Sequence, residues 1–203
     1  MGFFHFAFVT ILLWAGTSYF AETTYYIDTG SKLTLDGSSN VNKFTCACND
    51  QFPQSTLRFE LFEDGKSAKF SNASLSLRTK SLDCGNAQMN KDMYKTLRAD
   101  QHPNIRIELA RTQLLEANAL SSTEWTPLKA TSSLTISGVK KPVIFEVKAK
   151  RIGKDRIRLI ASKDVLMTDY DIDPPTAMLG LIKVNNTIRL NLDLIIVTVG
   201  NAS

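Results

Sequence analysis

The sequence contains few of the residues from which most active sites are built. Among its 203 residues there are two histidines, His5 and His102, and three cysteines. It has no Gly-x-Ser-x-Gly, His-Glu-x-x-His or glycine-rich phosphate-binding motif. These absences make most histidine-based chemistry untenable, and they favour a protein that is not an enzyme and that needs no cofactor.

Charge clusters are scarce as well. The formal net charge is +4 and no basic block is longer than a few residues, so nucleic acid is not an expected partner. Asp169, Asp171 and Asp173 alternate as at the start of a calcium-binding loop. However, Gly180 stands at the twelfth position, where such a loop needs glutamate. We therefore expect no metal site in this segment.

The amino-terminal segment carries no charged side chain before Glu22. Residues 3–14 form an almost unbroken apolar run that is followed by small residues, which is typical of a signal peptide, and the run is short for crossing a bilayer. We expect residues 1–21 to be a signal peptide, cleaved after Ser18 or Ala21. Residues 22–203 would then form one periplasmic or secreted domain. The alternatives are a retained anchor or a buried strand.

The three cysteines are disulfide candidates if the protein is exported. Cys46 and Cys48 lie two positions apart, so on a strand they point to the same face and either could pair with Cys84. We favour Cys46–Cys84, because Cys46 follows the apolar residue Phe44 closely whereas Cys48 lies nearer to a polar end. A metal site is the alternative, but His102 has no partner motif and three cysteines supply only three ligands.

Beyond residue 22, apolar and polar residues alternate in the pattern of half-buried β-strands. The clearest runs are residues 57–61, 105–109, 143–149 and 188–196, with weaker ones at 75–77 and 134–136. Turn sequences separate these runs, at Asp64-Gly65, Ser137-Gly138 and Gly153-Lys154-Asp155. Eight or nine closely spaced strands in mostly hairpin order predict an all-β fold, either an antiparallel barrel or a sandwich.

One segment, residues 90–99, lacks this alternation. Met89, Met93 and Leu97 fall four apart, on one face of a helix, and Asn90 can cap that helix. Such a short helix would close one end of a barrel, border its mouth, or simply pack as a crossover. Two further stretches are expected to be irregular connections: residues 111–126 and Asp173-Pro174-Pro175.

An eight-stranded barrel is just wide enough to be filled by side chains or to hold one slender ligand. The apolar faces carry almost no charge, so any guest would be apolar. Small residues on these faces favour an interior with free space over a filled structural barrel: Ala130, Ser132, Ala149 and Ala161. In the remaining alternative the apolar faces point outward, as in an outer-membrane barrel, but they are short for crossing a bilayer.

Several motifs occur in order along the chain: Tyr26-Ile27-Asp28, Ser81-Leu82-Asp83, Asn90-Lys91-Asp92-Met93, His102-Pro103-Asn104-Ile105, Leu134-Thr135-Ile136-Ser137-Gly138-Val139-Lys140-Lys141-Pro142-Val143, Thr168-Asp169-Tyr170 and Gly180-Leu181-Ile182-Lys183-Val184. From about Thr24 to Thr198 the sequence resembles the YceI-like family of exported polyisoprenoid-binding proteins. The resemblance implies an antiparallel eight-stranded lipocalin-like β-barrel with one short helix, enclosing a long isoprenoid. Ser137 departs from the histidine frequent in this family, and Asp169-Tyr170-Asp171 from the more usual Asp-Phe-Gly.

These observations predict a non-catalytic protein that binds an isoprenoid or another long-chain lipid and makes transient contact with a membrane. Each methylene moved from water into an apolar tunnel is stabilised by about 0.8 kcal/mol, so binding needs a long apolar ligand and a site that excludes water. The candidate lumen residues are Phe44, Leu57, Phe59, Leu61, Ile105, Ile107, Leu134, Ile136, Phe145, Val147, Leu190 and Leu192. The candidates at the mouth, for a polar headgroup, are Asn90, Lys91, Asp92 and Tyr170.

Overall fold

The structure, a computed structural model, describes residues 19–115, 120 and 123–199. Most of the predicted signal peptide therefore lies outside the described residues. The first strand begins at Tyr19, and Phe20 and Ala21 pair with Glu60 and Phe59. Cleavage after Ser18 would leave this strand whole, whereas cleavage after Ala21 would remove three of its residues.

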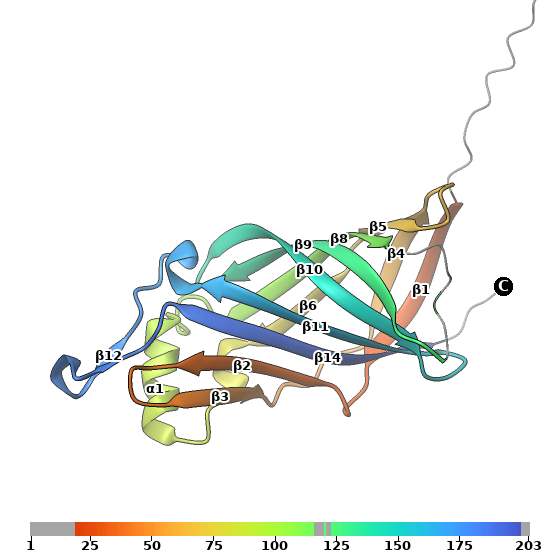
Figure 1. Ribbon diagram of the computed structural model, residues 1–203. Coiled ribbons are helices and arrows are strands. Elements are labelled where there is room, and N and C mark those ends of the chain that lie inside the picture. Colours follow the sequence, from red (N-terminus) through yellow and green to blue (C-terminus); the bar gives the residue numbers. More distant parts are fainter. Residues whose placement is uncertain (1–18, 116–119, 121–122, 200–203) are drawn as a thin grey trace, which may run out of the picture.

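Eight antiparallel strands close a ring, as the sequence predicts (Figure 1). In ring order they are β1 (Tyr19–Ile27), β4 (Ser55–Leu61), β5 (Ser67–Ser71), β8 (Asn104–Leu114), β9 (Thr126–Ile136), β10 (Val139–Arg151), β11 (Arg156–Leu166) and β14 (Thr187–Val199). The ring closes where residues 196–199 of β14 pair with residues 24–27 of β1. A closed ring leaves no free strand edge along this part of the wall.

The wall divides toward the other end of β14. There residues 189–193 pair with β2 (Lys32–Ser38) instead of β1, and β2 continues into β3 (Lys43–Cys48) and β7 (Leu82–Asp83). On the opposite side, β6 (Ser74–Arg78) takes over from β5 as the partner of β8. The helix α1 (Ala87–Thr96) lies at this end, beside β2 and β3 (Figure 1). The barrel is therefore closed by β1 at one end and bounded by β2, β3 and α1 at the other.

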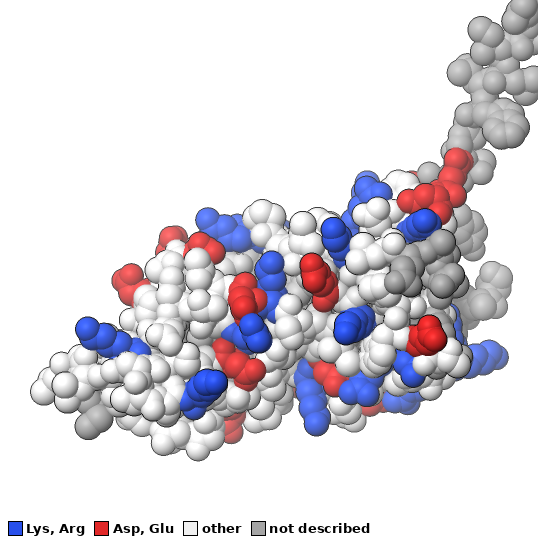
Figure 2. Space-filling model, in the orientation of Figure 1, with Lys and Arg blue, Asp and Glu red and all other residues white. Residues whose placement is uncertain are grey.

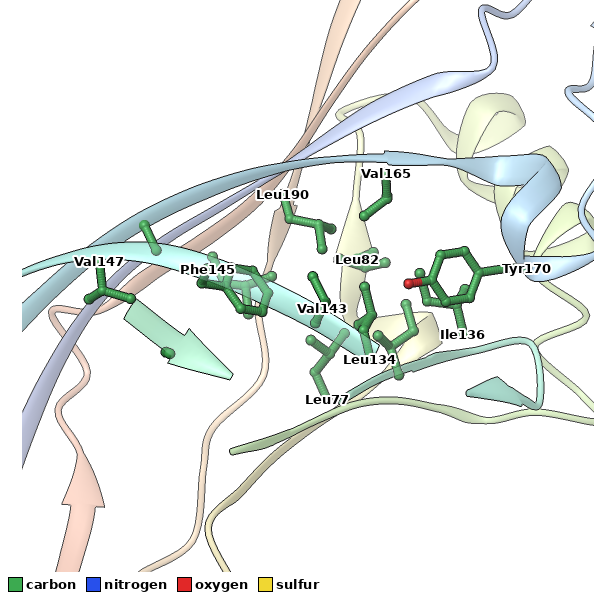
Figure 3. Close-up of a cluster of buried hydrophobic side chains, with 14 of the residues drawn as sticks. Leu77, Leu82, Leu134, Ile136, Val143, Phe145, Val147, Val165, Tyr170 and Leu190 are labelled. Carbon is green, nitrogen blue, oxygen red and sulfur yellow. The ribbon is translucent and has the colours of Figure 1, made fainter. Parts of the chain in front are cut away.

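The apolar faces of the strands point inward. Leu134, Phe145 and Leu190 belong to one buried cluster, part of which Figure 3 shows. The polar residues between them point outward and form ion pairs across strands, such as Arg158–Asp193 and Arg189–Asp164, each at 2.6 Å. Charged side chains of both signs are spread over the outer surface in Figure 2. This arrangement contradicts the alternative in which the apolar faces point outward.

The small inward residues do not leave free space where the sequence suggested it. Ala130 lies directly opposite Phe145 on the neighbouring strand, Ser132 lies opposite Val143, and Ala161 lies opposite Val147. All of these residues are buried, and so is Ala149. Because each small side chain faces a larger one, this part of the barrel is a packed core.

The predicted turns are confirmed, but two element boundaries differ. The helix begins at Ala87, and Asn86 is its cap, because the Asn86 side chain accepts a hydrogen bond from the Met89 backbone N–H at 3.0 Å. The expected loop at 111–126 is shorter, because β8 continues to Leu114 after a bulge and β9 begins at Thr126.

Short elements between the last two long strands escaped prediction. After β11 the chain forms the 3₁₀ turn η2 (Met167–Tyr170) and the small hairpin of β12 (Thr176–Ala177) and β13 (Ile182–Lys183), with the 3₁₀ turn η3 (Met178–Gly180) between them. A further 3₁₀ turn, η1 (Thr79–Ser81), links β6 to β7. Asp173-Pro174-Pro175 lies outside any strand, as expected. None of the described helices is long and apolar enough to cross a membrane.

Candidate functional site

A cavity of about 360 Å³ opens at the α1 end of the barrel. Its inner wall is formed by β8, β9 and β14, through Ile105, Ile136 and Leu190, and all three side chains are buried. Phe44 and Leu35 contribute from the β2–β3 side, η2 contributes Met167 and Tyr170, and Ile172 follows η2. The lining is therefore mostly apolar, and it comes from segments that are far apart in the sequence.

The helix α1 covers the cavity without sealing it. Met89, Met93 and Leu97, the helical face noted in the sequence, line the cavity, yet no residue of α1 is buried. The carboxy-terminal end of the helix is held by Ser137, whose hydroxyl donates to the Leu97 carbonyl at 2.8 Å. The helix therefore covers the cavity through partly buried side chains.

The Cys46–Cys84 disulfide fixes the amino-terminal end of α1 to β3, and its formation confirms the predicted pairing. Both cysteines line the cavity, whereas Cys48 is a free thiol. Asn90 strengthens the same junction, because its side chain accepts from the Cys84 backbone N–H and donates to Asp83, both at 2.8 Å. The hydrogen bond from Asn90 lowers the pKa of Asp83, with a further contribution from the Gly85 backbone N–H.

The position of Phe44 depends on a glycine in the neighbouring strand. Gly37 lies directly opposite Phe44, and a Cβ atom at Gly37 would lie 2.3 Å from Phe44 Cζ. Only glycine therefore lets the Phe44 ring lie across β2, where it lines the cavity.

The rim of the cavity is built from the β2–β3 turn and the β12–β13 hairpin. Asn40 joins the two: its side chain donates to the Leu181 carbonyl at 2.9 Å and accepts from the Lys183 backbone N–H at 2.8 Å. Large apolar side chains stand exposed on both segments, with Val41 63%, Leu179 106% and Leu181 73% exposed. The projecting end of the molecule is white in Figure 2, without charged side chains at its tip.

The residues predicted to line the lumen fall into three groups. Those that line the cavity are Phe44, Ile105, Ile136 and Leu190. Those that pack in or against the core without lining it are Leu134, Phe145, Val147, Ile107 and Leu192. Those of β4, toward the other end of the barrel, are Leu57 and Phe59, which are half-buried, and Leu61, which is exposed. Phe59 packs there against Phe70, with ring centroids 6.1 Å apart.

Only two of the four residues predicted at the mouth line the cavity. Asp92 and Tyr170 line the cavity, Asn90 has the structural role described above, and the Lys91 side chain is exposed. Sequence reasoning missed most of the wall from β2, η2 and the hairpin, because these short segments carry no long alternation. The helical face of α1 was the one signal that pointed to this end.

The electrostatics of the cavity are simple. No lysine, arginine or histidine of the described residues lines it, and Asp92 is its one carboxylate among them. Burial raises the pKa of Tyr170, and the negative charge of Asp169 adds to this effect. Its hydroxyl therefore stays protonated over the physiological pH range.

Among the described residues, no group of His, Cys, Asp and Glu side chains could hold a metal ion. Ser137 and Lys140 have the Ser-x-x-Lys spacing of some serine hydrolases. However, the Ser137 hydroxyl donates to Leu97, and Lys140 forms an ion pair with Glu108 at 2.6 Å. The two side chains are therefore engaged with different partners.

Comparisons with known proteins agree with this geometry. The family model of the YceI-like domain matches residues 25–196. A solved structure from Saccharophagus degradans, described as a polyisoprenoid binding domain implicated in plant cell wall breakdown, is 16% identical with a TM-score of 0.64. That match covers 87% of this chain and 99% of that one. Burkholderia cenocepacia BcnA is 13% identical with a TM-score of 0.57, covering 83% and 98%.

The YCEI protein of Campylobacter jejuni is 15% identical with a TM-score of 0.52, covering 66% of this chain and 75% of that one. No curated protein matches the chain. At these identities the structural matches establish a shared fold, whereas the family model spans most of the sequence. The chain therefore belongs to the YceI-like family.

Proposed function

We propose that this protein is an exported, non-catalytic carrier that holds a long isoprenoid, or a similar apolar chain, in the cavity under α1. The observation that carries the proposal is the apolar cavity of about 360 Å³ at one end of a closed barrel. Its volume lies at the lower end of the range of about 300–1,000 Å³ for small-molecule pockets. It would therefore enclose one end of a long chain.

The driving force for binding would be the transfer of apolar groups out of water. Each methylene placed against side chains such as Ile105, Ile136 and Leu190 is worth about 0.8 kcal/mol. Affinity would therefore grow with the length of chain that the cavity encloses, and the proposed activity needs no reacting group. The cavity would then serve carriage or storage rather than turnover.

We further propose that the rim contacts a membrane. Val41, Leu179 and Leu181 are exposed, and Val41 also lines the cavity, so the apolar rim is continuous with the cavity wall. An apolar chain that passes from a bilayer into the cavity avoids crossing water only if the rim touches the bilayer. The hydrogen bonds of Asn40 hold the two rim segments together for such a contact.

The proposal is tested by native mass spectrometry of the chain beginning at Tyr19, exported by a bacterial host and purified without detergent. We expect an additional mass that organic extraction removes and that chemical analysis identifies as an isoprenoid or another long-chain lipid. Ile136→Trp and Met93→Trp should each lower the bound fraction, because the larger side chain occupies the cavity.

Ile144→Trp is the matched control, because Ile144 lies on β10 but is 52% exposed on the outer face. Met93 is only half-buried, so Met93→Trp should fold even if Ile136→Trp does not. The carrier proposal fails if the parent protein carries no extractable mass and also fails to bind added isoprenoids. A barrel whose function depends on its filled core would then be the better description.

A further inference from the structure

Tyr170 is placed by contacts that leave its hydroxyl unused. It ends the turn η2, which Asn186 holds: the Asn186 side chain accepts from the Thr168 backbone N–H at 3.1 Å and donates to the Thr168 hydroxyl at 2.9 Å. Asp171 follows in the left-handed conformation, with φ 54°, and turns the chain so that Ile172 is also buried. The Tyr170 ring is thereby held against the core.

The hydroxyl of Tyr170 points into the cavity. The residue is 3% exposed and lines the cavity, and Figure 3 shows its oxygen turned inward, toward the buried side chains. None of the hydrogen bonds among the described residues involves this hydroxyl, and it is not one of the buried unpaired atoms, so it stays accessible from the cavity. A phenylalanine ring would fill the same space in the core. What the tyrosine adds is therefore a polar group that faces the cavity.

We propose that the Tyr170 hydroxyl donates a hydrogen bond to an uncharged oxygen of the bound lipid, such as an alcohol, ether or carbonyl. This inference rests on the proposed function and narrows its ligand class from any apolar chain to a neutral oxygenated one. Since no cationic side chain among the described residues lines the cavity and Asp92 does, a carboxylate or phosphate inside it would lack a counter-charge. Lipids with an anionic head would have to keep that head outside the cavity.

The raised pKa of Tyr170 is consistent with this role, because a protonated phenol is a donor. The hydrogen bond would fix the depth at which the oxygen of the lipid lies, and the apolar wall would accept the rest of the chain. Selectivity would therefore come from this hydrogen bond, together with other polar residues of the lining such as Asn42 and Gln88, in a mostly apolar site.

The test uses three probes with the same fifteen-carbon skeleton: farnesol, which is a neutral alcohol, farnesane, which is a hydrocarbon, and farnesyl phosphate, which is an anion. Their affinities are measured on the delipidated chain by displacement of a fluorescent apolar dye. In Tyr170→Phe we expect affinity for farnesol to fall roughly three- to tenfold, the usual worth of one hydrogen bond. Affinity for farnesane should not change, and farnesyl phosphate should bind the parent more weakly than farnesol.

The melting temperature of the ligand-free protein separates a binding role from a structural one. Tyr170→Phe should melt at about the same temperature, because the Tyr170 hydroxyl makes no hydrogen bond with the described residues that the substitution would remove. Tyr94→Phe is the control: the Tyr94 hydroxyl donates within the protein, to the Leu82 carbonyl at 2.7 Å, so this variant should melt lower and keep the farnesol-to-farnesane ratio.

Equal losses for farnesol and farnesane in Tyr170→Phe, or no loss for either, would overturn the hydrogen-bond proposal while leaving the carrier intact. Tight binding of farnesyl phosphate would overturn the restriction to neutral lipids. If the parent protein binds none of the three probes, the proposed function itself fails. These results are distinguishable from one another in a single set of titrations.

Discussion

The middle of the barrel and its α1 end share the same alternation of residues, but one is packed and the other is hollow. In the middle, Phe145 faces Ala130 and Val143 faces Ser132, so large and small side chains complement one another across β9 and β10. At the α1 end, β14 leaves β1 and pairs with β2, and the cover is a helix without any buried residue. Free space therefore arises where the wall divides and its cover buries none of its residues, because direct complements are missing there.

The largest effect is expected from converting the packed middle into more cavity. Phe145→Ala removes a ring that is 3% exposed, which should lower the free energy of unfolding by about 3–5 kcal/mol. The variant should also accept longer prenols than the parent, because the space opposite Ala130 opens. Chemical denaturation and a series of prenols of increasing length measure the two effects.

Ile144→Ala, on the exposed face of the same strand, is the control and should change stability by no more than about 0.5 kcal/mol. An unchanged preference for chain length in a folded Phe145→Ala protein would show that the middle of the barrel does not communicate with the cavity.

The second-largest effect is expected from removing the disulfide that joins the start of α1 to β3. Replacing both Cys46 and Cys84 by alanine removes a cross-link between residues 38 apart in the sequence and should cost about 2–4 kcal/mol. The α1 end should loosen more than the middle, since Cys84 lies just before α1. Hydrogen exchange of the α1 amides, compared with those of β10, measures this difference. Cys48→Ala retains the disulfide and is the control; equal exchange in all three proteins would contradict the prediction.

A smaller effect is expected at the rim. Leu179→Asp combined with Leu181→Asp should leave stability within about 0.5 kcal/mol, because both side chains are exposed. The double variant should take up a fluorescent prenol from phospholipid vesicles several-fold more slowly, since it loses apolar surface that would enter the bilayer. Its affinity for free farnesol should not change. Equally fast uptake by the parent and the variant would contradict the proposed membrane contact.

The smallest effect is the pH dependence of an ion pair on the packed side. The hydrogen bond from Arg158 lowers the pKa of Asp193, against the opposing effect of partial burial. The pair therefore stabilises the fold above the unfolded pKa of about 4 and loses this contribution as the pH falls through the lower folded value. The stability difference between the parent and Asp193→Asn should be constant from about pH 5 to 8 and shrink below about pH 4. A constant difference down to about pH 2 would contradict the assignment.

Much of the fold could be predicted because its strands are long and alternate strictly. The run from Ile188 to Ile196 forms the inner face and the outer ion pairs of β14, and the turn at Ser137-Gly138 lies where expected. The cap of α1 was predicted wrongly as Asn90, because a suitable residue type does not show where the helix begins. The structure has Asn86 as the cap, whereas the Asn90 side chain bonds to Cys84 and Asp83.

The candidate site could be predicted only in part, because alternation gives the direction of a side chain and not its neighbour. Leu134 and Ile136 have the same pattern, yet Ile136 lines the cavity and Leu134 does not. Small residues such as Ala130 suggested free space, but their partners fill it. The apolar rim at the β12–β13 hairpin was missed because each of these strands has only two residues. Such short strands show no alternation of apolar and polar residues.

The sequence by itself determined an all-β chain with alternating apolar faces and one short helix, because these depend on local period and spacing. It favoured Cys46 as the partner of Cys84, but only the tertiary structure decided this pairing and the inward direction of the apolar faces. The tertiary structure alone decided where the interior is filled and where it is open. That outcome depends on which side chains meet across strands and on the exchange of β1 for β2 along β14. It likewise placed the Tyr170 hydroxyl in the cavity without a partner, since the path of η2 is set by distant contacts with Asn186.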